Sequence, residues 1–420
     1  MYERERHEQM DANWSAARAR DFARALFTET AATFARLGHW PAHPNDGEIP
    51  EGGHHHALYH GLAGVCWGQL ELAARGYGEV VDDPVDALEQ ARTAAMADLD
   101  EDPGFDAAPT DSLAEAGDYR TNYRLGLLIA ELGFMVPLLR LRPDASTVRA
   151  SLDLIEANLD NRVLELLWGS PGSLLLLSAI KEAGLADARA AELLARGVAW
   201  MGDRLVTSPT TGAQLWRQDL YGHRVCLLGA GHGFAGNALA VLRALPHLPG
   251  VDAERWRDLM RTTALLTATR ADGHANWRQS IDGQRPGRTD WLTQICHGAP
   301  GMIVCLAELM GEDPEFDAVL LEGGELVWAA GPLTKGGNFC HGTAGNGYAF
   351  LKLFEQTGDE RWLARARSFA AAAMQQVARD HAAHGDHHYS LWTGDTGVAL
   401  FADACLTGTA TTPCLEHFLP

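Results

Sequence analysis

The sequence predicts an all-α protein, an (α/α)7 toroid in which seven outer helices surround seven inner helices. A Gly-x-x-Gly step followed by an apolar run recurs along the chain. The apolar runs alternate with amphipathic stretches, and the alternating β-branched pattern of strands is scarce. Helix pairs repeated in this way cannot bury their faces alone, so neighbouring units are expected to stack and close into a ring.

The first 53 residues precede this repeat. They predict a lead-in helix that ends at Gly38, with Asp11 or Asn13 as its N-cap, and then a polar loop to Gly53. The repeats occupy residues 54–410. No linker or change of composition divides the chain, so we expect residues 1–420 to form a single domain.

Six full Gly-x-x-Gly steps and one degenerate copy mark the starts of the predicted inner helices. The degenerate copy, Ala130–Gly133, fills the widest gap and brings the units to seven, about 40 to 70 residues apart. Glycine allows a helix start to pack closely on its neighbour, so most of these glycines are expected to be structural. The full steps are Gly61–Gly64, Gly169–Gly172, Gly233–Gly236, Gly298–Gly301, Gly342–Gly345 and Gly394–Gly397.

The apolar runs after the glycines are hydrophobic on nearly all sides, as in Leu174–Leu177 and Tyr348–Phe354. Such helices are buried, so they form the inner layer. Amphipathic stretches near residues 84–97, 187–201, 251–266 and 359–377 are expected to form outer helices. In a closed ring the inner helix N-termini would gather at one mouth.

Composition excludes some classes of partner. The chain has 420 residues and a net charge of −21, which disfavours nucleic acid and anionic membrane surfaces. The charged N-terminus lacks the apolar region of a signal peptide, and no run of about 18 apolar residues predicts a membrane span. Seven irregularly spaced cysteines favour reduced thiols. We therefore expect a cytoplasmic protein.

Two copies of a Cys-His-Gly-x-x-Gly phrase, starting at Cys296 and Cys340, predict a metal site. Thiolate and imidazole ligands suit Zn²⁺, and a three-ligand site keeps one position open for chemistry. Cys340 and His341 are adjacent, so both can face one ion only where the chain turns. The alternative interpretation is buried cysteines with neighbouring histidines. The other five cysteines lack this context and are expected to be fillers of the core or surface.

The sequence resembles the lanthionine synthetase C family, the LanC cyclases, and is most similar to their LanC-like branch. The likeness runs from about residue 58 to about residue 403. The phrases that carry it are Glu165–Gly172, Leu228–Gly236, Cys296–Gly301, Cys340–Asn346 and Ser390–Gly397.

The resemblance implies an (α/α)7 toroid with one catalytic Zn²⁺. Its ligands would be Cys296, Cys340 and His341, with water or a substrate thiol as the fourth. Members of the family add thiols to dehydroalanine or dehydrobutyrine. In the cyclases the thiol is a peptide cysteine, and in the LanC-like branch it is glutathione.

Three further residues are candidate catalytic groups. His232 precedes a Gly-x-x-Gly step, and the resemblance implies that it is the acid that protonates the α-carbon. Glu165 stands where the cyclases have aspartate, so it is expected to hold that histidine or take the thiol proton. His297 is expected to bind the enolate oxygen or support a ligand. Each has a structural alternative, as a capping, core or solvated side chain.

The chain departs from the family pattern at two places. Cyclases often carry an arginine shortly before the first zinc cysteine, where this chain has Leu292, with Arg285 and Arg288 nearby but out of register. LanC-like proteins often have glutamate where this chain has Thr393. Two histidine-rich segments are interpreted as polar loops. They are His54 to His56 with His60, and His381, His384, His387 and His388.

These observations favour an enzyme that adds glutathione to dehydroamino acids in peptides or proteins. One alternative is a lanthionine-forming cyclase, which would act beside a separate dehydratase on a precursor peptide. Another is a non-catalytic, zinc-containing adaptor that binds glutathione or a peptide. A toroid glycosidase or terpene cyclase would need paired carboxylates or an aspartate-rich magnesium motif, and neither stands out.

Overall fold

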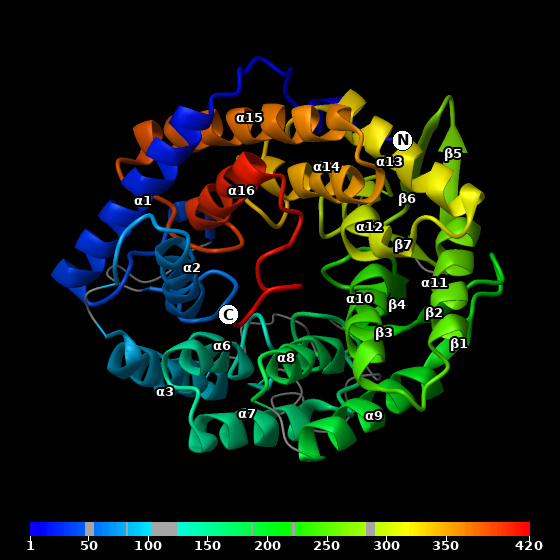
Figure 1. Cartoon of the computed structure of the whole chain (residues 1–420), viewed down its shortest axis with the longest axis horizontal. Coiled ribbons are helices and arrows are strands. Elements are labelled where there is room, and N and C mark those ends of the chain that lie inside the picture. Colours follow the sequence, from blue (N-terminus) through cyan, green and yellow to red (C-terminus); the bar gives the residue numbers. More distant parts are fainter. Residues whose placement is uncertain (47–53, 81–82, 102–123, 186–187, 221–222, 283–289) are drawn as a thin grey trace.

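The computed structural model describes residues 1–46, 54–80, 83–101, 124–185, 188–220, 223–282 and 290–420. Two concentric layers of helices form a closed ring in the described part of the chain (Figure 1). The seven inner helices are α2 (Leu62–Ala74), α6 (Leu132–Leu141), α8 (Ser170–Glu182), α10 (Phe234–Ala244), α12 (Ala299–Leu306), α14 (Thr343–Thr357) and α16 (Asp395–Thr407). The seven outer helices are α1 (Ala16–Leu37), α3 (Val85–Glu101), α7 (Ala145–Asn158), α9 (Ala188–Asp203), α11 (Ala253–Thr267), α13 (Pro314–Ala330) and α15 (Glu360–His384). The predicted (α/α)7 toroid is confirmed.

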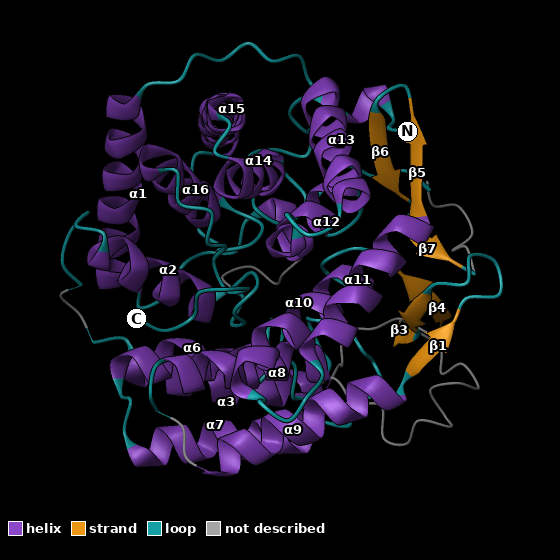
Figure 2. Ribbon diagram, turned by 45° about the vertical axis from the view of Figure 1, so that its right-hand side comes forward, coloured by secondary structure: helices purple, strands orange, loops and turns teal. Residues whose placement is uncertain are grey.

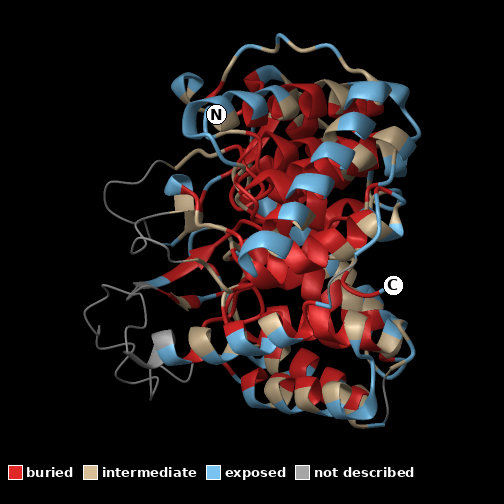
Figure 3. Ribbon diagram, turned by 90° about the vertical axis from the view of Figure 1, so that its left-hand side faces the viewer, coloured by how far each residue is buried: buried red, intermediate tan, exposed pale blue. Residues whose placement is uncertain are grey.

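Burial follows the two layers. The inner helices are buried along nearly their whole length, whereas α9 and α11 bury one face only. Figure 3 shows the buried residues gathered in the interior of the ring. The outer helices therefore act as an amphipathic coat over an apolar inner ring.

Helix α1 closes the ring, although the sequence analysis treated it as a lead-in. It packs against α16 and α2, the last and first inner helices, and supplies the seventh outer helix. Its N-cap is Ser15, whose side chain accepts a hydrogen bond from the Arg18 amide, so the expected caps Asp11 and Asn13 are wrong. Gly38 ends the helix in the left-handed conformation, as predicted.

Short antiparallel strands on one side of the ring were not predicted (Figure 2). They are β1 (Leu205–Thr207) with β2 (Gln214–Trp216), β3 (Gln218–Leu220) with β4 (His223–Leu227) and β7 (Ser280–Ile281), and β5 (Ala268–Ala271) with β6 (His274–Trp277). They follow α9 and α11 and lead into the turns before α10 and α12. The remaining regular segments are 3-10 turns at Arg4–Arg6, Pro44–Asp46, Leu245–His247 and Ala307–Leu309.

The second glycine of every step, including Gly133 of the degenerate copy, lies where a side chain has no room. A Cβ atom there would come within 1.9 to 2.3 Å of the carbonyl oxygen six residues earlier. It would also come within 2.8 to 3.3 Å of a side chain from the preceding unit. Each unit makes this second contact with the unit before it. In the first unit, Gly64 makes it with Leu391 of the last unit, so the contacts close the ring. Glycine is therefore required for close approach, as predicted, all around the ring.

Backbone hydrogen bonds join the turns before the inner helices. The amide of Cys340 donates to the carbonyl of Trp392, and the amide of Trp392 donates to that of Tyr59, at 2.8 and 3.0 Å. Likewise, the amide of Tyr59 donates to the carbonyl of Leu128, and the amide of Leu128 donates to that of Leu167. The mouth is thus a belt of connected turns rather than a set of independent loops.

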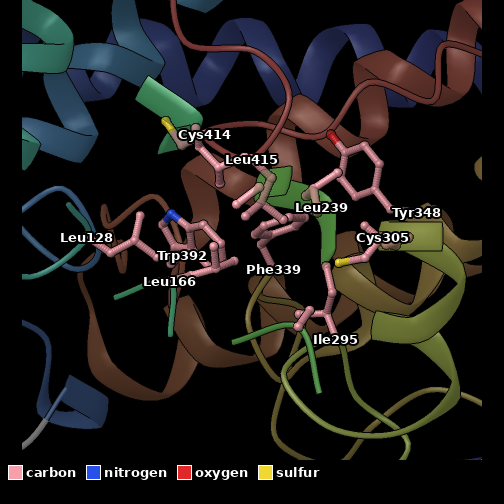
Figure 4. Close-up of a cluster of buried hydrophobic side chains, with 14 of the residues drawn as sticks. Leu128, Leu166, Leu239, Ile295, Cys305, Phe339, Tyr348, Trp392, Cys414 and Leu415 are labelled. Atoms are coloured by element: carbon pink, nitrogen blue, oxygen red, sulfur yellow. The ribbon is translucent and has the colours of Figure 1, made fainter. Parts of the chain in front are cut away.

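The C-terminal segment 409–420 runs into the middle of the ring (Figure 1). It contacts Glu71 of α2 and Lys352 of α14, toward the C-terminal ends of these inner helices, so it marks the end of the ring opposite the mouth, the tail end. Trp67 Nε1 donates to the carbonyl of Phe418, and Leu415 is buried. Figure 4 shows Cys414 and Leu415 converging with side chains from the mouth turns, among them Phe339 and Trp392. Because this apolar cluster fills the middle of the ring, the mouth and the tail end are separate environments. Among the described residues, no helix is both long and apolar enough to cross a membrane.

Candidate metal centre and active site

Cys296, Cys340 and His341 come together at the mouth of the ring. One ligand atom from each of the three lies within 4.8 Å of the others. Cys296 stands in the turn before α12, and Cys340 and His341 in the turn before the neighbouring inner helix α14. Both cysteines are buried, at 8% and 6% exposure.

The repeat explains why these residues meet. Cys296 and Cys340 each stand five residues before the second glycine of their step, at Gly301 and Gly345. Equivalent positions of adjacent units are neighbours in the ring, so the two sulfur atoms face each other. His341 follows directly in the turn, where its amide donates to Asn338 Oδ1 at 3.1 Å.

The two thiols share a hydrogen bond, which makes one of them easy to deprotonate. The bond from Cys340 lowers the pKa of Cys296 despite burial, and His232 and a hydrogen bond from Gln294 Nε2, at 2.9 Å, assist. The same bond to Cys296, together with burial, raises the pKa of Cys340. The shared bond thus favours the thiolate form of Cys296, and a bound cation would take the place of the proton between the two sulfur atoms.

His341 completes a donor set that fits zinc. Burial, followed by the nearby charge of Lys335, lowers the pKa of His341 to about 4, so its imidazole is neutral and able to ligate. Two sulfur atoms and one imidazole nitrogen are a typical set for tetrahedral Zn²⁺ with one open position. By contrast, burial raises the pKa of Cys226 to about 11 and also raises those of Cys66, Cys305, Cys405 and Cys414.

Glu165 and His232 form a pair beside the thiols. His232 Nδ1 lies 2.8 Å from Glu165 Oε2. The carboxylate is fully buried and also accepts the amides of Leu167 and Trp168 at 3.1 and 2.6 Å, which fixes its position. The turn that carries His232 lies against Cys296, because a Cβ at Gly231 would come within 3.1 Å of the Cys296 Cβ. The bond between Glu165 and Nδ1 therefore holds the His232 imidazole in place beside the thiol cluster.

His297 lies near this pair. Its ring centroid is 6.0 Å from that of His232, and its Nε2 is 3.2 Å from Gln279 Nε2. The carbonyl of Gln279 in turn accepts the amide of Leu228, just before the His232 turn. The unpredicted strand segments thus position both histidines.

Two residues that were not predicted from the sequence contact the sulfur atoms. Gln294 bonds Cys296, and the Tyr59 hydroxyl bonds Cys340. Burial, followed by the charge on Cys340, raises the pKa of Tyr59, so the phenol stays protonated and donates. Tyr59 stands five residues before Gly64, the position that the two cysteines occupy in their units. Comparison of the repeats at that position would have found it, whereas nothing in the pattern marks Gln294.

A cavity of about 630 Å³ opens beside His341. Lys335 and Asn338 line it near the metal centre, and Arg379, Asp380 and His388 line it on the side of α15 and the turn that follows. This space can admit a substrate to the open side of the thiol and imidazole cluster.

The interpretation of the histidine-rich segments as polar loops is wrong for His381 and His384, which belong to helix α15. The other histidines of these segments lie in loops or turns, although His388 is buried. His60 stands four residues before Gly64, the repeat position of His232, His297 and His341. It stacks on His55 with ring centroids 4.0 Å apart, and burial lowers the pKa of His60 to about 3.

The two departures from the family pattern have different outcomes. Arg285 and Arg288 lie outside the described residues. At Thr393, where the family's glutamate is missing, the Asp46 carboxylate from the segment after α1 hydrogen-bonds the threonine side chain. The same Asp46 carboxylate lies 2.6 Å from His388 Nε2.

Taken together, the fold and the site define a helical toroid with a thiol and imidazole cluster at its mouth. The family model for lanthionine synthetase C-like proteins matches residues 143–418, and the chain belongs to this family. The predicted family is thereby confirmed.

Two relatives and one solved structure are similar to this chain. LanC-like protein GCL1 of Arabidopsis thaliana is 32% identical over 188 residues, which are 43% of this chain and 41% of that protein. Glutathione S-transferase LANCL1 of Danio rerio is 31% identical over 211 residues, 48% of this chain and 47% of that protein. The matched regions thus span somewhat less than half the length of these relatives. Nisin cyclase shares the fold, with a TM-score of 0.55, 13% identity and coverage of 90% of this chain and 97% of that one.

Proposed function

We propose that the protein catalyses the zinc-dependent addition of glutathione to dehydroalanine or dehydrobutyrine residues in peptides or proteins. The observation that carries this proposal is the Glu165–His232 pair beside the cluster of Cys296, Cys340 and His341. A cluster that only bound metal for stability would have no need of an oriented proton donor next to it.

Cys296, Cys340 and His341 would hold Zn²⁺. When bound, Zn²⁺ would lower the pKa of a substrate thiol so that the sulfur is nucleophilic near neutral pH. The cavity beside His341 would admit the thiol and the peptide.

The chain's own residues would serve the addition and the protonation. The S–Cβ bond forms while the Cα=Cβ π bond breaks, and the electron pair moves to the carbonyl oxygen as an enolate. His232 would deliver a proton to the α-carbon through Nε2, because Glu165 binds Nδ1. His297 would bind the enolate oxygen. The proton gained at the α-carbon balances the proton that the thiol loses.

This reaction needs a compartment that keeps thiols reduced and a source of dehydroamino acids. A reduced thiol substrate fits the cytoplasm, which we propose as its location. The dehydroamino acid must come from dehydration of serine or threonine, which a separate dehydratase can perform. We also propose that residues 1–420 act as a single domain, because α1 completes the outer layer of the ring.

The test is incubation of a dehydroalanine peptide with the enzyme, Zn²⁺ and glutathione, followed by mass spectrometry. We expect a glutathione adduct that forms faster than in enzyme-free and His232→Gln reactions. An adduct rate equal to the enzyme-free rate would refute the enzyme function and favour the adaptor.

A second peptide distinguishes addition from cyclisation. It carries both dehydroalanine and a cysteine, and a thiol-alkylating reagent is added after the reaction without glutathione. Loss of alkylation with unchanged peptide mass would identify ring formation and favour the cyclase. Retained alkylation, together with adduct formation in the first assay, supports glutathione transfer.

A further inference from the structure

A second cluster of potential ligands includes two residues that line the same cavity, Asp380 and His388. It consists of His43, Asp380 and His388, whose ligand atoms lie within 4.8 Å of one another. The three residues come from the segment after α1, the C-terminal part of α15 and the turn before α16. Nothing in the thiol-addition mechanism uses them.

The nitrogen of His43 that faces this cluster has no hydrogen-bond partner. His43 is 4% exposed, and its Nε2 makes no hydrogen bond, although Asp380 Oδ2 lies 3.5 Å away. A buried ring nitrogen without a partner loses its hydration with no compensation. A bound cation would provide the missing interaction.

Charge suits a cation as well. The rings of His43 and His388 stack nearly parallel with centroids 4.4 Å apart, so both imidazoles border one small space, and one ring would turn out of the stack when both bind the same ion. Asp46 adds a second carboxylate, 2.6 Å from His388 Nε2, with only 4% of its side chain exposed. The two carboxylates would balance the charge of one divalent ion. Burial, and then the neighbouring His388, lower the pKa of His43 to about 4, so this imidazole is neutral near pH 7.

A third cluster, Glu29, His381 and His387, shows the contrast. His387 Nδ1 lies 2.7 Å from Asp395, and its Nε2 lies 3.3 Å from Glu29. Although burial alone would lower it, the bond with Asp395 raises the pKa of His387. Both nitrogens of this ring face carboxylates, so neither is left without a partner.

We propose that His43, Asp380 and His388, with Asp46 beside them, form a second metal site that binds one divalent transition-metal ion through imidazole and carboxylate ligands. The ion would tie the segment after α1 to the end of α15. It would also place positive charge on the wall of the cavity. The proposal does not depend on thiol addition, since it concerns residues that the reaction does not use.

The test is metal content with Zn²⁺ as the probe. The full chain is stripped with a chelator, reloaded, freed of loosely bound metal and measured by mass spectrometry of the metal. We expect two equivalents of Zn²⁺ in the wild type and one each in His388→Ala and Cys340→Ala. The double variant should bind none.

Cobalt identifies which site has been lost. With Co²⁺ in place of Zn²⁺, the charge-transfer absorption of the thiolate site should persist in His388→Ala and disappear in Cys340→Ala. His39→Gln is the matched control, because it alters a partly exposed histidine of the same segment that stacks on His54 instead. It should keep both equivalents.

Asp380→Asn preserves side-chain volume and serves if His388→Ala fails to fold. We expect Asp380→Asn and His43→Gln to bind one equivalent with the cobalt absorption intact. A wild type that binds a single equivalent would overturn the proposal. So would a second equivalent that survives His43→Gln, Asp380→Asn and His388→Ala together.

Discussion

The two ends of the toroid differ in how completely their buried polar groups are paired within the protein. At the tail end, Glu71 is 5% exposed and both of its carboxylate oxygens are paired. Arg75 Nε and Arg140 donate to it at 2.8 Å each, and His417 of the tail lies 3.0 Å away. At the mouth, His43 Nε2 has no hydrogen bond, and the sulfur atoms of Cys296 and Cys340 are hydrogen-bonded to each other.

This difference separates stability from function. The tail end also holds pairs between Lys352 and Glu416, at 2.7 Å, and between Arg75 and Asp403, at 2.7 Å. Buried charges are stable only when they are paired, so this network fastens the C-terminal segment onto the inner helices. The mouth instead leaves donors unsatisfied within the protein, which is the arrangement expected where ligands bind.

The largest expected effect is at the mouth, in Cys340→Ala. We expect loss of the ion at the thiolate centre and a fall in the rate of glutathione addition of at least about 10³-fold, or about 4 kcal/mol. The measurements are metal content and initial rates. Cys305→Ala, which alters a buried cysteine of α12, is the control and should keep both. Full zinc retention in Cys340→Ala would move the ligand set elsewhere.

Next in size is His232→Gln, which removes the proton donor and leaves the thiols in place. We expect kcat to fall about 10²- to 10³-fold, with KM and zinc content little changed. Glu165→Gln should cost less, because the amide oxygen can still hold the imidazole or the turn. If His232→Gln changes KM alone, the residue binds substrate and another group supplies the proton.

A change at the tail end should affect folding and spare the metal. Glu71→Gln leaves Arg75 and Arg140 without their buried carboxylate, and we expect a loss of about 3 kcal/mol in the free energy of unfolding near pH 7. The measurement is denaturant unfolding, with metal content as the second readout. Glu89→Gln, at an exposed pair with Arg92, should change stability by less than about 1 kcal/mol.

The pH dependence of Glu71→Gln tests the cause. Although burial alone would raise it, the bonds from His417 and Arg140 hold the pKa of Glu71 far below its usual range. A depressed pKa in the folded state stabilises the protein above the unfolded pKa of about 4.3, and the stabilisation is lost as pH falls further. The difference between wild type and variant should therefore shrink below about pH 4. A difference that does not vary with pH would indicate lost packing instead.

The repeat made the fold and the cysteine centre predictable. The glycine steps gave the number of inner helices, and equal spacing from the second glycine placed Cys296 beside Cys340. The closing role of α1 was not predictable, because an amphipathic pattern shows that a helix has a partner but not which one. The strands were missed because most have only two to four residues, too few for an alternating pattern to register.

The second cluster was hidden for a related reason. His43 and His388 are far apart in the sequence and lie outside the repeated phrase, so only the closed ring brings them into contact. Their neighbourhood was therefore interpreted as polar loop. The local sequence pattern predicts which residues occupy equivalent positions in the repeats. It does not predict which segments come into contact when the ring of helices closes.

The smallest expected effect belongs to Tyr59, which connects the predictable and unpredictable parts of the mouth. Its hydroxyl donates to Cys340 Sγ, and its backbone carbonyl accepts from Trp392 in the belt of turns. Tyr59→Phe removes the first bond and keeps the second, so the fold should be unaffected. Loss of a hydrogen bond to a metal ligand typically weakens metal binding about 10-fold or more, and we expect about 10-fold here, or about 1.4 kcal/mol. Competition with a zinc chelator measures this change, and Tyr389→Phe, whose hydroxyl bonds Thr33 away from the thiols, is the matched control. Equal zinc affinity in Tyr59→Phe and wild type would mean that the hydroxyl does not support the ligand, leaving the shared position in the repeat as a consequence of packing alone.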